Sequence, residues 1–230
     1  MPAQKFDVVI IGAGIAGSAL AVALAGQGLS LALVEAQSLE RKPLPDDTSL
    51  KTFDARVSAL TPNSVRFLEQ LGAWSHIAGY RHCPYGHMTV WDAEGTGRIE
   101  FDCAELKAPA LGYIVENRAI VDGLLLAMDQ AHGIQRYNPD RLQSCQRCED
   151  GSMELLLDSG KTIEASLLVG ADGALSRVRE MFDFKTREWD YGHQALVCTV
   201  QTAEEHQATA WQRWQGTRSS SLRRCALLSP

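Results

Sequence analysis

The sequence contains no run that approaches the ~18 consecutive apolar residues of a membrane-spanning helix. It also lacks an excess of positive charge, because 22 Lys and Arg residues against 28 Asp and Glu residues give a formal net charge of -6. A protein that binds nucleic acid needs a basic face, so no nucleic-acid partner is expected. Only Lys5 precedes the first predicted strand, and that strand carries Asp7, which is unlike a signal peptide. We therefore expect a cytoplasmic protein.

Metal-binding patterns are scarce as well. Of the six cysteines, Cys145 and Cys148 have C-x-x-C spacing, but no second pair matches it. A structural zinc site needs four ligands, so we expect ordinary reduced thiols, with a redox pair as the unsupported alternative. The six histidines show neither H-E-x-x-H nor H-x₃-H spacing. No metal site is predicted.

The most informative pattern is a glycine-rich turn between an apolar run, Val8 to Ile11, and a helical pattern. It contains Gly12, Gly14 and Gly17, and a second apolar strand ends at Glu35, 18 residues past Gly17. This is the spacing of a dinucleotide-binding βαβ unit, whose acidic residue accepts from a ribose. The alternative is an ordinary βαβ unit with glycines in its turn.

Each glycine in this first corner has a predicted mechanical role. Gly12 makes the tight turn, Gly14 lets the backbone approach a pyrophosphate, and Gly17 lets the helix pack on the strand. Ile15 and Ala16 open the helix, where unpaired N–H groups and the helix dipole favour a phosphate. The corner is therefore predicted to bind a cofactor through Gly12, Gly14, Ile15, Ala16 and Gly17.

The rest of the chain alternates helical and strand patterns. With 230 residues, 45% hydrophobic and 22% charged, it fits a soluble globular protein of one large or two small domains. Periodicity predicts a helix from Thr61 to Gly72, a hairpin of residues 88–92 and 98–102, a helix at 118–131, a hairpin of 154–157 and 162–163, and strands at 167–169 and 193–201.

A second strand-to-helix corner follows residues 167–169. It presents Asp172, Ser176, Arg177 and Arg179 together. The simple interpretation is a capped turn in which Asp172 accepts from helix N–H groups. Capping and ligand binding are compatible, so this interpretation does not exclude a functional role.

At this point the chain resembles the FAD-dependent aromatic hydroxylases, the single-component flavoprotein monooxygenases. The glycine turn with Glu35 resembles their FAD fingerprint, and Gly170 to Arg179 resembles their Asp-Gly motif, which serves both FAD and NADPH. Between these lie Asp54-x-Arg56, which resembles the segment along the flavin, and Val115-Glu-Asn-Arg118, which leads a cofactor-binding helix. Residues 101–117 and Trp189-Asp-Tyr191 are most similar to the hydroxylases of ubiquinone biosynthesis. The resemblance covers roughly residues 5 to 213.

The resemblance implies an α/β fold. It consists of a Rossmann-like FAD-binding domain of the glutathione-reductase type (βαβ) with an inserted, incomplete, mainly β substrate domain. The FAD-binding domain is expected at residues 1–78 and 115–184, the substrate domain at 79–114 and 185–210, and an atypical basic tail at 211–230.

The resemblance also implies roles for single residues. Glu35 accepts from the adenosine ribose, and Arg56 and Arg118 meet the pyrophosphate or the flavin edge. Asp172, with Gly173 and Arg179 of the same motif, orders the pyrophosphate and the approach of the nicotinamide. For each arginine, a surface salt bridge is the alternative. No catalytic side chain and no metal are expected, because FAD carries the chemistry with NAD(P)H and O₂ as co-substrates.

The C-terminal end departs from the family pattern. A third family motif, Gly-Asp with neighbouring Ala and His, has no counterpart, and Trp211 to Pro230 contains four arginines and no acid. We expect a C-terminally truncated hydroxylase with a non-native tail after about Arg213, which binds the ADP half of FAD but holds the flavin ring poorly.

The expected partner is a small aromatic or quinone-precursor substrate. A prenylated substrate leaves open a peripheral contact with the inner membrane, and the resemblance leaves open membership of a ubiquinone-biosynthesis complex. Two alternatives to the hydroxylase remain: a flavin-dependent oxidoreductase without oxygen transfer, and an inactive remnant that acts only as an interaction module.

Overall fold

A computed structural model describes residues 3–47, 49–192 and 194–214. The chain divides into two compact units, and each is described by itself. Unit 1 comprises Met1–Pro43, Leu71–Ala73 and Val121–Arg187, and unit 2 comprises Leu44–Gln70, Trp74–Ile120 and Glu188–Pro230.

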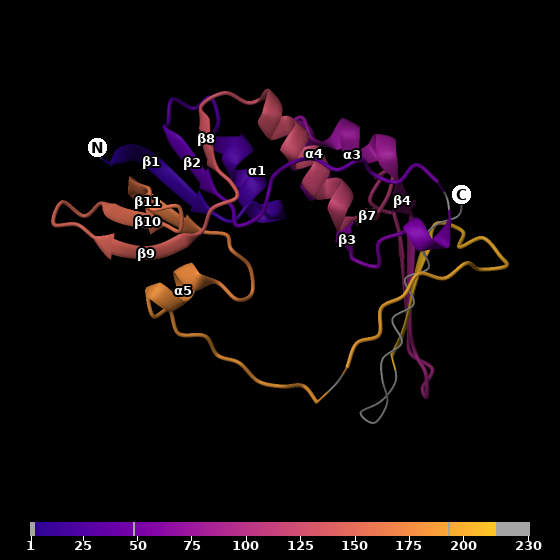
Figure 1. The fold of residues 1–230 in the computed structure, drawn as a ribbon. Coiled ribbons are helices and arrows are strands. Elements are labelled where there is room, and N and C mark those ends of the chain that lie inside the picture. The colour runs from indigo at the N-terminus through magenta and orange to yellow at the C-terminus, as the bar shows by residue number, and fades with distance from the viewer. Residues whose placement is uncertain (1–2, 48, 193, 215–230) are drawn as a thin grey trace. The chain divides into compact units, whose positions relative to one another are not determined.

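Unit 1 contains a six-stranded sheet in the order β8-β2-β1-β11-β10-β9. Its strands are β1 (Gln4–Ile11), β2 (Leu31–Val34), β8 (Ile134–Tyr137), β9 (Leu142–Arg147), β10 (Met153–Leu157) and β11 (Thr162–Gly170). The first four strands in this order run parallel, and β10 and β9 extend the sheet in antiparallel fashion. Ile11 pairs with Val34 on one side and Gly170 on the other, so the carboxyl ends of β2, β1 and β11 lie side by side (Figure 1).

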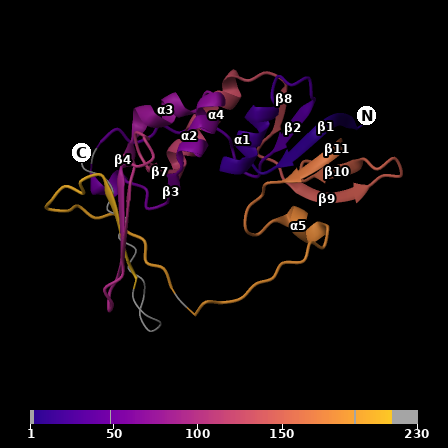
Figure 2. The same cartoon turned by 180° about the vertical axis from the view of Figure 1, so that it is seen from behind.

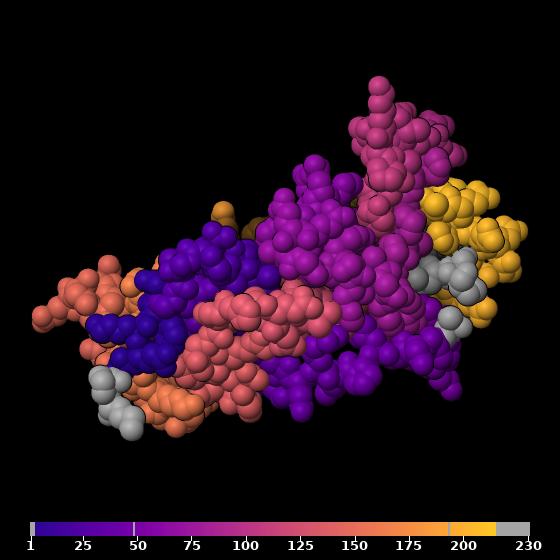
Figure 3. All heavy atoms as spheres, turned by 90° about the horizontal axis from the view of Figure 1, so that it is seen from above, coloured from indigo at the N-terminus to yellow at the C-terminus, as the bar shows by residue number. Residues whose placement is uncertain are grey.

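Apolar side chains cover both faces of this sheet. From β1, Val9 and Ile11 join one hydrophobic cluster, and Val8 and Ile10 join another. Helix α1 (Ile15–Leu24) and the later part of α4 (Asn117–Gln130) pack on the second cluster. The antiparallel strands and α5 (Arg177–Met181) complete the first. Figure 3 shows the outer surface, with the N-terminal residues in indigo. Burial on both faces explains why β1 is a continuous apolar run rather than an alternating one.

Unit 2 contains two three-stranded sheets, seen from behind in Figure 2. In one, β7 (Gly112–Glu116) pairs antiparallel with β3 (Val57–Leu60) and β4 (His82–Tyr85). In the other, β5 (His87–Asp92) pairs antiparallel with β6 (Arg98–Asp102) and parallel with β12 (Thr209–Trp214). The helical elements are η1 (Leu50–Thr52, a 3₁₀ turn), α2 (Pro62–Gln70), α3 (Trp74–Tyr80) and the start of α4. Across both units, none of the described helices is long and apolar enough to cross a bilayer.

Several elements predicted from periodicity are confirmed. The helix expected from Thr61 to Gly72 is α2, and the helix expected at 118–131 is α4. The predicted hairpin of residues 88–92 and 98–102 is formed by β5 and β6. The strand segments expected at 162–163 and 167–169 are the two ends of the single strand β11.

The strand predicted at 193–201 is wrong for the residues that the structure describes. Residues 194–201 have no regular secondary structure, Leu196 is 92% exposed, and residue 193 lies outside the described part. Alternating polarity gives a strand only where a neighbouring edge accepts its backbone hydrogen bonds, and the edge of β5 is paired with β12 instead. Of the predicted basic tail, Trp211 to Trp214 belong to β12, and residues 215–230 lie outside the described residues.

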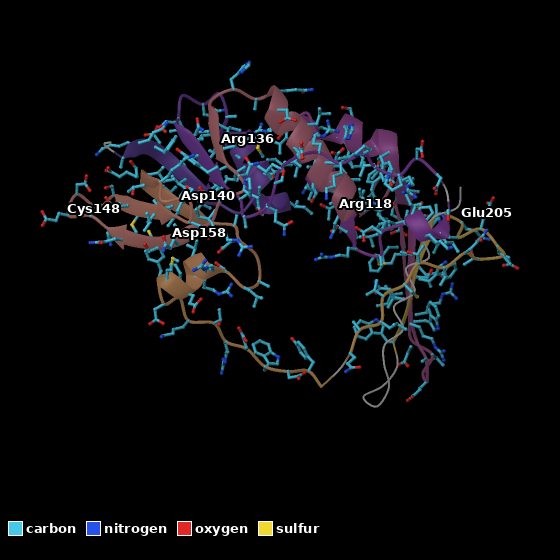
Figure 4. All side chains as sticks on the ribbon, in the orientation of Figure 1. Arg118, Arg136, Asp140, Cys148, Asp158 and Glu205 are labelled. Carbon is cyan, nitrogen blue, oxygen red and sulfur yellow. The ribbon has the colours of Figure 1, made fainter. Side chains whose placement is uncertain are left out.

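Asp140, in the loop after β8, forms hydrogen bonds with the turn between β10 and β11 (Figure 4). Its carboxylate accepts from the Ser159 N–H at 3.1 Å and hydroxyl at 2.6 Å, and from the Arg141 N–H at 2.9 Å. Burial acts to raise the pKa of this carboxyl group, but the hydrogen bonds outweigh it, so the pKa of Asp140 lies below its ordinary value. The ionised form therefore stabilises the fold of unit 1.

We expect Asp140→Asn to lower the free energy of unfolding by about 1 kcal/mol near neutral pH. A depressed folded pKa contributes stability above the unfolded pKa of about 3.9, and this contribution is lost as pH falls through the folded pKa. The difference between wild type and variant should therefore shrink below about pH 4. Urea unfolding at neutral and acidic pH measures this, with the exposed Asp158→Asn as a control of little effect. A difference that is independent of pH contradicts the expectation.

Candidate functional site: two adjoining strand-to-helix corners

The first corner joins β1 to α1 through a turn where two positions accept only glycine. Gly12 has a φ of +100°, and a Cβ on it would lie 2.4 Å from the carbonyl oxygen of Ala171. A Cβ on Gly17 would lie 1.9 Å from the carbonyl oxygen of Gly12. Both glycines are therefore required by close approach of backbone to backbone, as the tight-turn and close-packing roles demand.

The N-terminus of α1 presents open polar groups. Gly14 is the N-cap residue, no side chain in the described part of the protein caps the helix there, and a Cβ on Gly14 would meet nothing within 4 Å. Ile15 and Ala16 lie in the first turn, where the N–H groups of an α-helix have no internal acceptor. This end of the helix suits an anionic group that approaches the backbone closely.

Glu35 follows β2, and its carboxylate lies against the same turn. Its Oε2 accepts from the Ala13 N–H at 2.7 Å, and its Oε1 accepts from the Gln37 N–H at 2.9 Å. An ionised carboxylate has about four acceptor positions, so capacity remains for hydroxyl groups of a ligand. The structure thus brings Glu35 to the first corner, and its ribose-binding role stays a prediction.

The second corner follows β11 and is closed by Asp172. Its Oδ1 accepts from the Ser176 hydroxyl at 2.5 Å, and its Oδ2 accepts from the N–H groups of Arg177 at 2.7 Å and Val178 at 3.2 Å. Burial acts to raise the pKa of Asp172, but these hydrogen bonds outweigh it and the pKa lies below its ordinary value. The capped turn foreseen from the sequence is thus present, and both carboxylate oxygens take part in it.

The two corners are in direct contact. The N–H of Ala171 donates to the carbonyl of Ile11 at 2.7 Å. A Cβ on Gly12 would also lie only 2.9 Å from the Cα of Asp172. Glu35 and Asp172 therefore stand on opposite sides of the turn that follows β1.

Gly173 and Arg179 belong to the second corner and line a cavity of about 460 Å³. The cavity is bounded by β9, β10, β11, α5 and Phe184. The Arg179 guanidinium donates to the carbonyl of Ala174, so it folds back onto its own corner. The cofactor-binding roles of Gly173 and Arg179 stay predictions.

Arg56 lies in unit 2, just before β3. Its backbone is fixed, because its N–H donates to Asp54 Oδ1 at 2.9 Å and its carbonyl accepts from the Asn117 N–H at 2.9 Å. In contrast, no hydrogen bond or ion pair holds its guanidinium within the described residues. The alternative of a surface salt bridge is therefore not found for Arg56 among the described residues, and its guanidinium is available to a ligand.

Arg118 also lies in unit 2, at the start of α4 (Figure 4). Its Nε donates to Glu116 Oε2 at 2.7 Å, and its Nη2 donates to the Tyr80 hydroxyl at 3.1 Å and to the Thr52 carbonyl. Sequence reasoning did not single out Glu116, nor Arg81, which forms an ion pair with it. The signal was an acid at the end of an apolar strand directly before Asn-Arg, a pattern that predicts a buried carboxylate with a cationic partner.

The acidic, histidine and cysteine side chains of the described residues bear on metal and thiol chemistry. Within residues 3–47, 49–192 and 194–214, no cluster of three His, Cys, Asp or Glu side chains is arranged to hold a metal ion. Burial and the neighbouring Cys148 raise the pKa of Cys145 to about 11. This thiol is therefore protonated at neutral pH and is a poor nucleophile.

Comparison with known proteins gives consistent matches. A family model described as FAD binding domain matches residues 5–219. The chain is 34% identical over 214 residues to the 3-demethoxyubiquinol 3-hydroxylase of Escherichia coli K12, an alignment that covers 93% of this chain and 53% of that protein. It is 36% identical over 225 residues to the mitochondrial ubiquinone biosynthesis monooxygenase COQ6 of Xenopus tropicalis, covering 92% and 47%. The chain thus spans about half the length of these relatives.

A solved structure supports the fold. PqsL of Pseudomonas aeruginosa, in complex with 2-aminobenzoylacetate, matches with a TM-score of 0.66 over 82% of this chain and 48% of that chain, at 22% identity. At this level of identity the match shows a shared fold. It agrees with the mixed α/β architecture and the parallel sheet of unit 1.

Substitutions in the glycine turn can distinguish a glycine that the backbone requires, Gly12, from one with open space around it, Gly14. Gly12→Ala should lower the free energy of unfolding by more than about 2 kcal/mol, because it combines a positive φ with a backbone clash. Gly14→Ala should leave it unchanged or raise it by up to about 1 kcal/mol, because the space there is open. Urea unfolding without any ligand measures both variants. Equal losses of stability would contradict this assignment.

Proposed function

This chain belongs to the FAD binding domain family, and we propose that the protein uses FAD, NAD(P)H and O₂ to hydroxylate an aromatic ring of a ubiquinone precursor. The names of the two relatives, a hydroxylase and a monooxygenase of ubiquinone biosynthesis, support this reaction. Because the chain spans about half of their length, the reaction and its substrate are proposals for the whole protein.

The observation that carries the cofactor assignment is the meeting of three features at the first corner. A turn that only glycine can form, an uncapped helix N-terminus and a carboxylate with spare acceptor capacity lie together there. A dinucleotide offers a diphosphate to the helix N–H groups and a ribose diol to the carboxylate. The residues present therefore fit FAD.

When bound, FAD would supply the redox chemistry that links NAD(P)H oxidation and O₂ to ring hydroxylation. The residues of this chain bind and orient. The N–H groups of Ile15 and Ala16 take the pyrophosphate, Gly14 leaves room for it, and Glu35 accepts from the ribose hydroxyls. Arg56 offers its unpaired guanidinium to the phosphate or the flavin edge.

Asp172 acts by shaping its corner rather than by reacting. Both of its oxygens accept hydrogen bonds from residues 176–178, and this cap fixes the turn that contains Gly173 to the start of α5, which carries Arg179. A fixed turn can order the pyrophosphate and the approach of the nicotinamide without moving a proton. No side chain of this chain is assigned an acid, base or nucleophilic role.

The substrate is proposed to bind to the domain formed by residues 79–114 and 185–210. Ile99 is 58% exposed and Phe101 48% exposed on β6, and Leu106 is 70% exposed in the segment that follows. Exposed apolar groups of this kind suit a prenylated aromatic ring. We extend the proposal to a cytoplasmic protein that contacts the membrane peripherally, where such a substrate resides, and that works within a ubiquinone-biosynthesis complex.

Isotope labelling tests the reaction. Purified protein with FAD, NAD(P)H, ¹⁸O₂ and a short-chain 3-demethoxyubiquinol should give a hydroxylated ring that carries one ¹⁸O atom for each NAD(P)H consumed. NAD(P)H oxidation without ¹⁸O in the ring would instead support an oxidoreductase without oxygen transfer. FAD binding without any NAD(P)H oxidation would support the interaction module.

Substitution of Glu35 tests the site. Glu35→Ala should weaken FAD binding about 10-fold, because it removes an acceptor for the ribose hydroxyls. Riboflavin lacks the adenosine, so its binding should change little. Fluorescence titration measures both, with the exposed Glu40→Ala as the matched control. An equal loss for riboflavin and FAD would argue against the ribose assignment.

A further inference from the structure

Glu116, at the end of β7 in unit 2, is a buried acid between two arginines. Glu116 is 3% exposed. Its Oε2 accepts from Arg118 Nε at 2.7 Å and from the Asp54 N–H at 3.1 Å, and its Oε1 lies 3.4 Å from Arg81 Nε. Among the described residues, Arg81 Nε and Glu116 Oε1 have no hydrogen bond, so the ion pair is their polar contact.

Arg81 also contacts the segment before Arg56. Its guanidinium lies over the ring of Phe53, at 4.1 Å from the centroid, and over that of Tyr80, at 4.5 Å. Its Nη2 donates to the Thr52 carbonyl at 3.2 Å, the same oxygen that accepts from Arg118. Two guanidinium groups thus converge on one carbonyl, and stacking restricts how Arg81 can rotate.

The charges in this cluster do not balance. The ion pairs of Arg81 and Arg118 are both with Glu116, so two positive charges face one negative charge and the trio carries a formal net charge of +1. The Arg81 side chain is 14% exposed, so this excess charge is poorly hydrated. An anion that approaches Arg118, whose side chain is 31% exposed, would be attracted by it.

Glu116 also connects this cluster to Arg56. It holds the Asp54 N–H, Asp54 Oδ1 accepts from the Arg56 N–H, and the carbonyl of Arg56 accepts from the Asn117 N–H directly after Glu116. The backbone on either side of Arg56 is therefore fixed by the residue pair 116–117. Moving the carboxylate would move both arginines that the resemblance assigns to the cofactor.

We propose that Glu116, with Arg81, is a positioning residue that holds Arg118 and the Arg56 segment ready to bind a phosphate group. This inference rests on the proposed function. Glu116 holds the guanidinium of Arg118 directly and the backbone of Arg56 through Asp54. Arg81 pairs with the same carboxylate and leaves the trio with a net positive charge that attracts an anion. A buried carboxylate deprived of one such partner would be strongly unfavourable, which explains why both arginines are present.

Glu116→Gln tests the proposal, because it keeps the side-chain shape but removes the negative charge that pairs with Arg81 and Arg118 and replaces one of the two oxygens with an NH₂ group. We expect FAD binding to weaken about 10- to 100-fold. Adenosine has no phosphate, so its affinity should stay within about 2-fold, inside the usual scatter of surface effects. Glu116→Asp, which keeps the charge, should recover part of the loss. The matched control is Glu100→Gln, which removes the same charge from an arginine pair where Glu100 is 61% exposed.

The possible results distinguish a failure of the positioning role of Glu116 from a failure of the proposed function. If the wild-type protein binds no FAD, the proposed function fails. If it binds FAD and Glu116→Gln binds FAD equally well, the positioning role fails. If FAD and adenosine weaken together and the ligand-free melting temperature falls, Glu116 is merely structural and the proposal is overturned. If Glu116→Gln does not fold, Arg81→Lys replaces it in the same assay, and an unchanged FAD affinity there overturns the proposal.

Discussion

The backbone of Gly12 passes so close to Ala171 that a Cβ would lie 2.4 Å from its carbonyl oxygen. This contact results from the strand pairing. Ile11 pairs with Gly170, so β1 and β11 end side by side and the turns that follow them lie next to each other. Because it joins main chain to main chain, it leaves no freedom for side chains to adjust. The two corners are consequently fixed to one another.

The two carboxylates of this site have different tasks, and the difference follows from their hydrogen bonds. Asp172 uses both oxygens within its own corner, where they accept from one hydroxyl and two N–H groups. Glu35 accepts one N–H group on each oxygen and keeps capacity for a ligand. The first therefore determines shape, and the second is suited to recognition. Sequence position alone does not distinguish these tasks, because both residues follow apolar parallel strands.

The sequence predicted those elements whose formation depends on residues close together in the chain. The glycine turn, helix α2 and the β5–β6 hairpin follow from glycine, capping residues and periodicity, and all are present. The ion pair of Arg81 with Glu116 could not be foreseen, because Arg81 directly precedes β4 and Glu116 ends β7, and the pairing of these two strands is decided by the whole sheet. The same reason explains why the strand predicted at 193–201 is wrong. Alternation of polar and apolar residues indicates which side chains would share a face of a strand, but not whether another strand is available to pair with it. The short strand β9, with its polar sequence LQSCQR, carries no periodic signal at all.

The central claim is that one dinucleotide binds where the two corners meet. The most direct measurement is a crystal structure of the protein with FAD. The account predicts a ribose hydroxyl of the adenosine within hydrogen-bond distance of the Glu35 carboxylate, and the pyrophosphate at the N–H groups of Ile15 and Ala16. An FAD molecule ordered elsewhere, with neither contact formed, would contradict it.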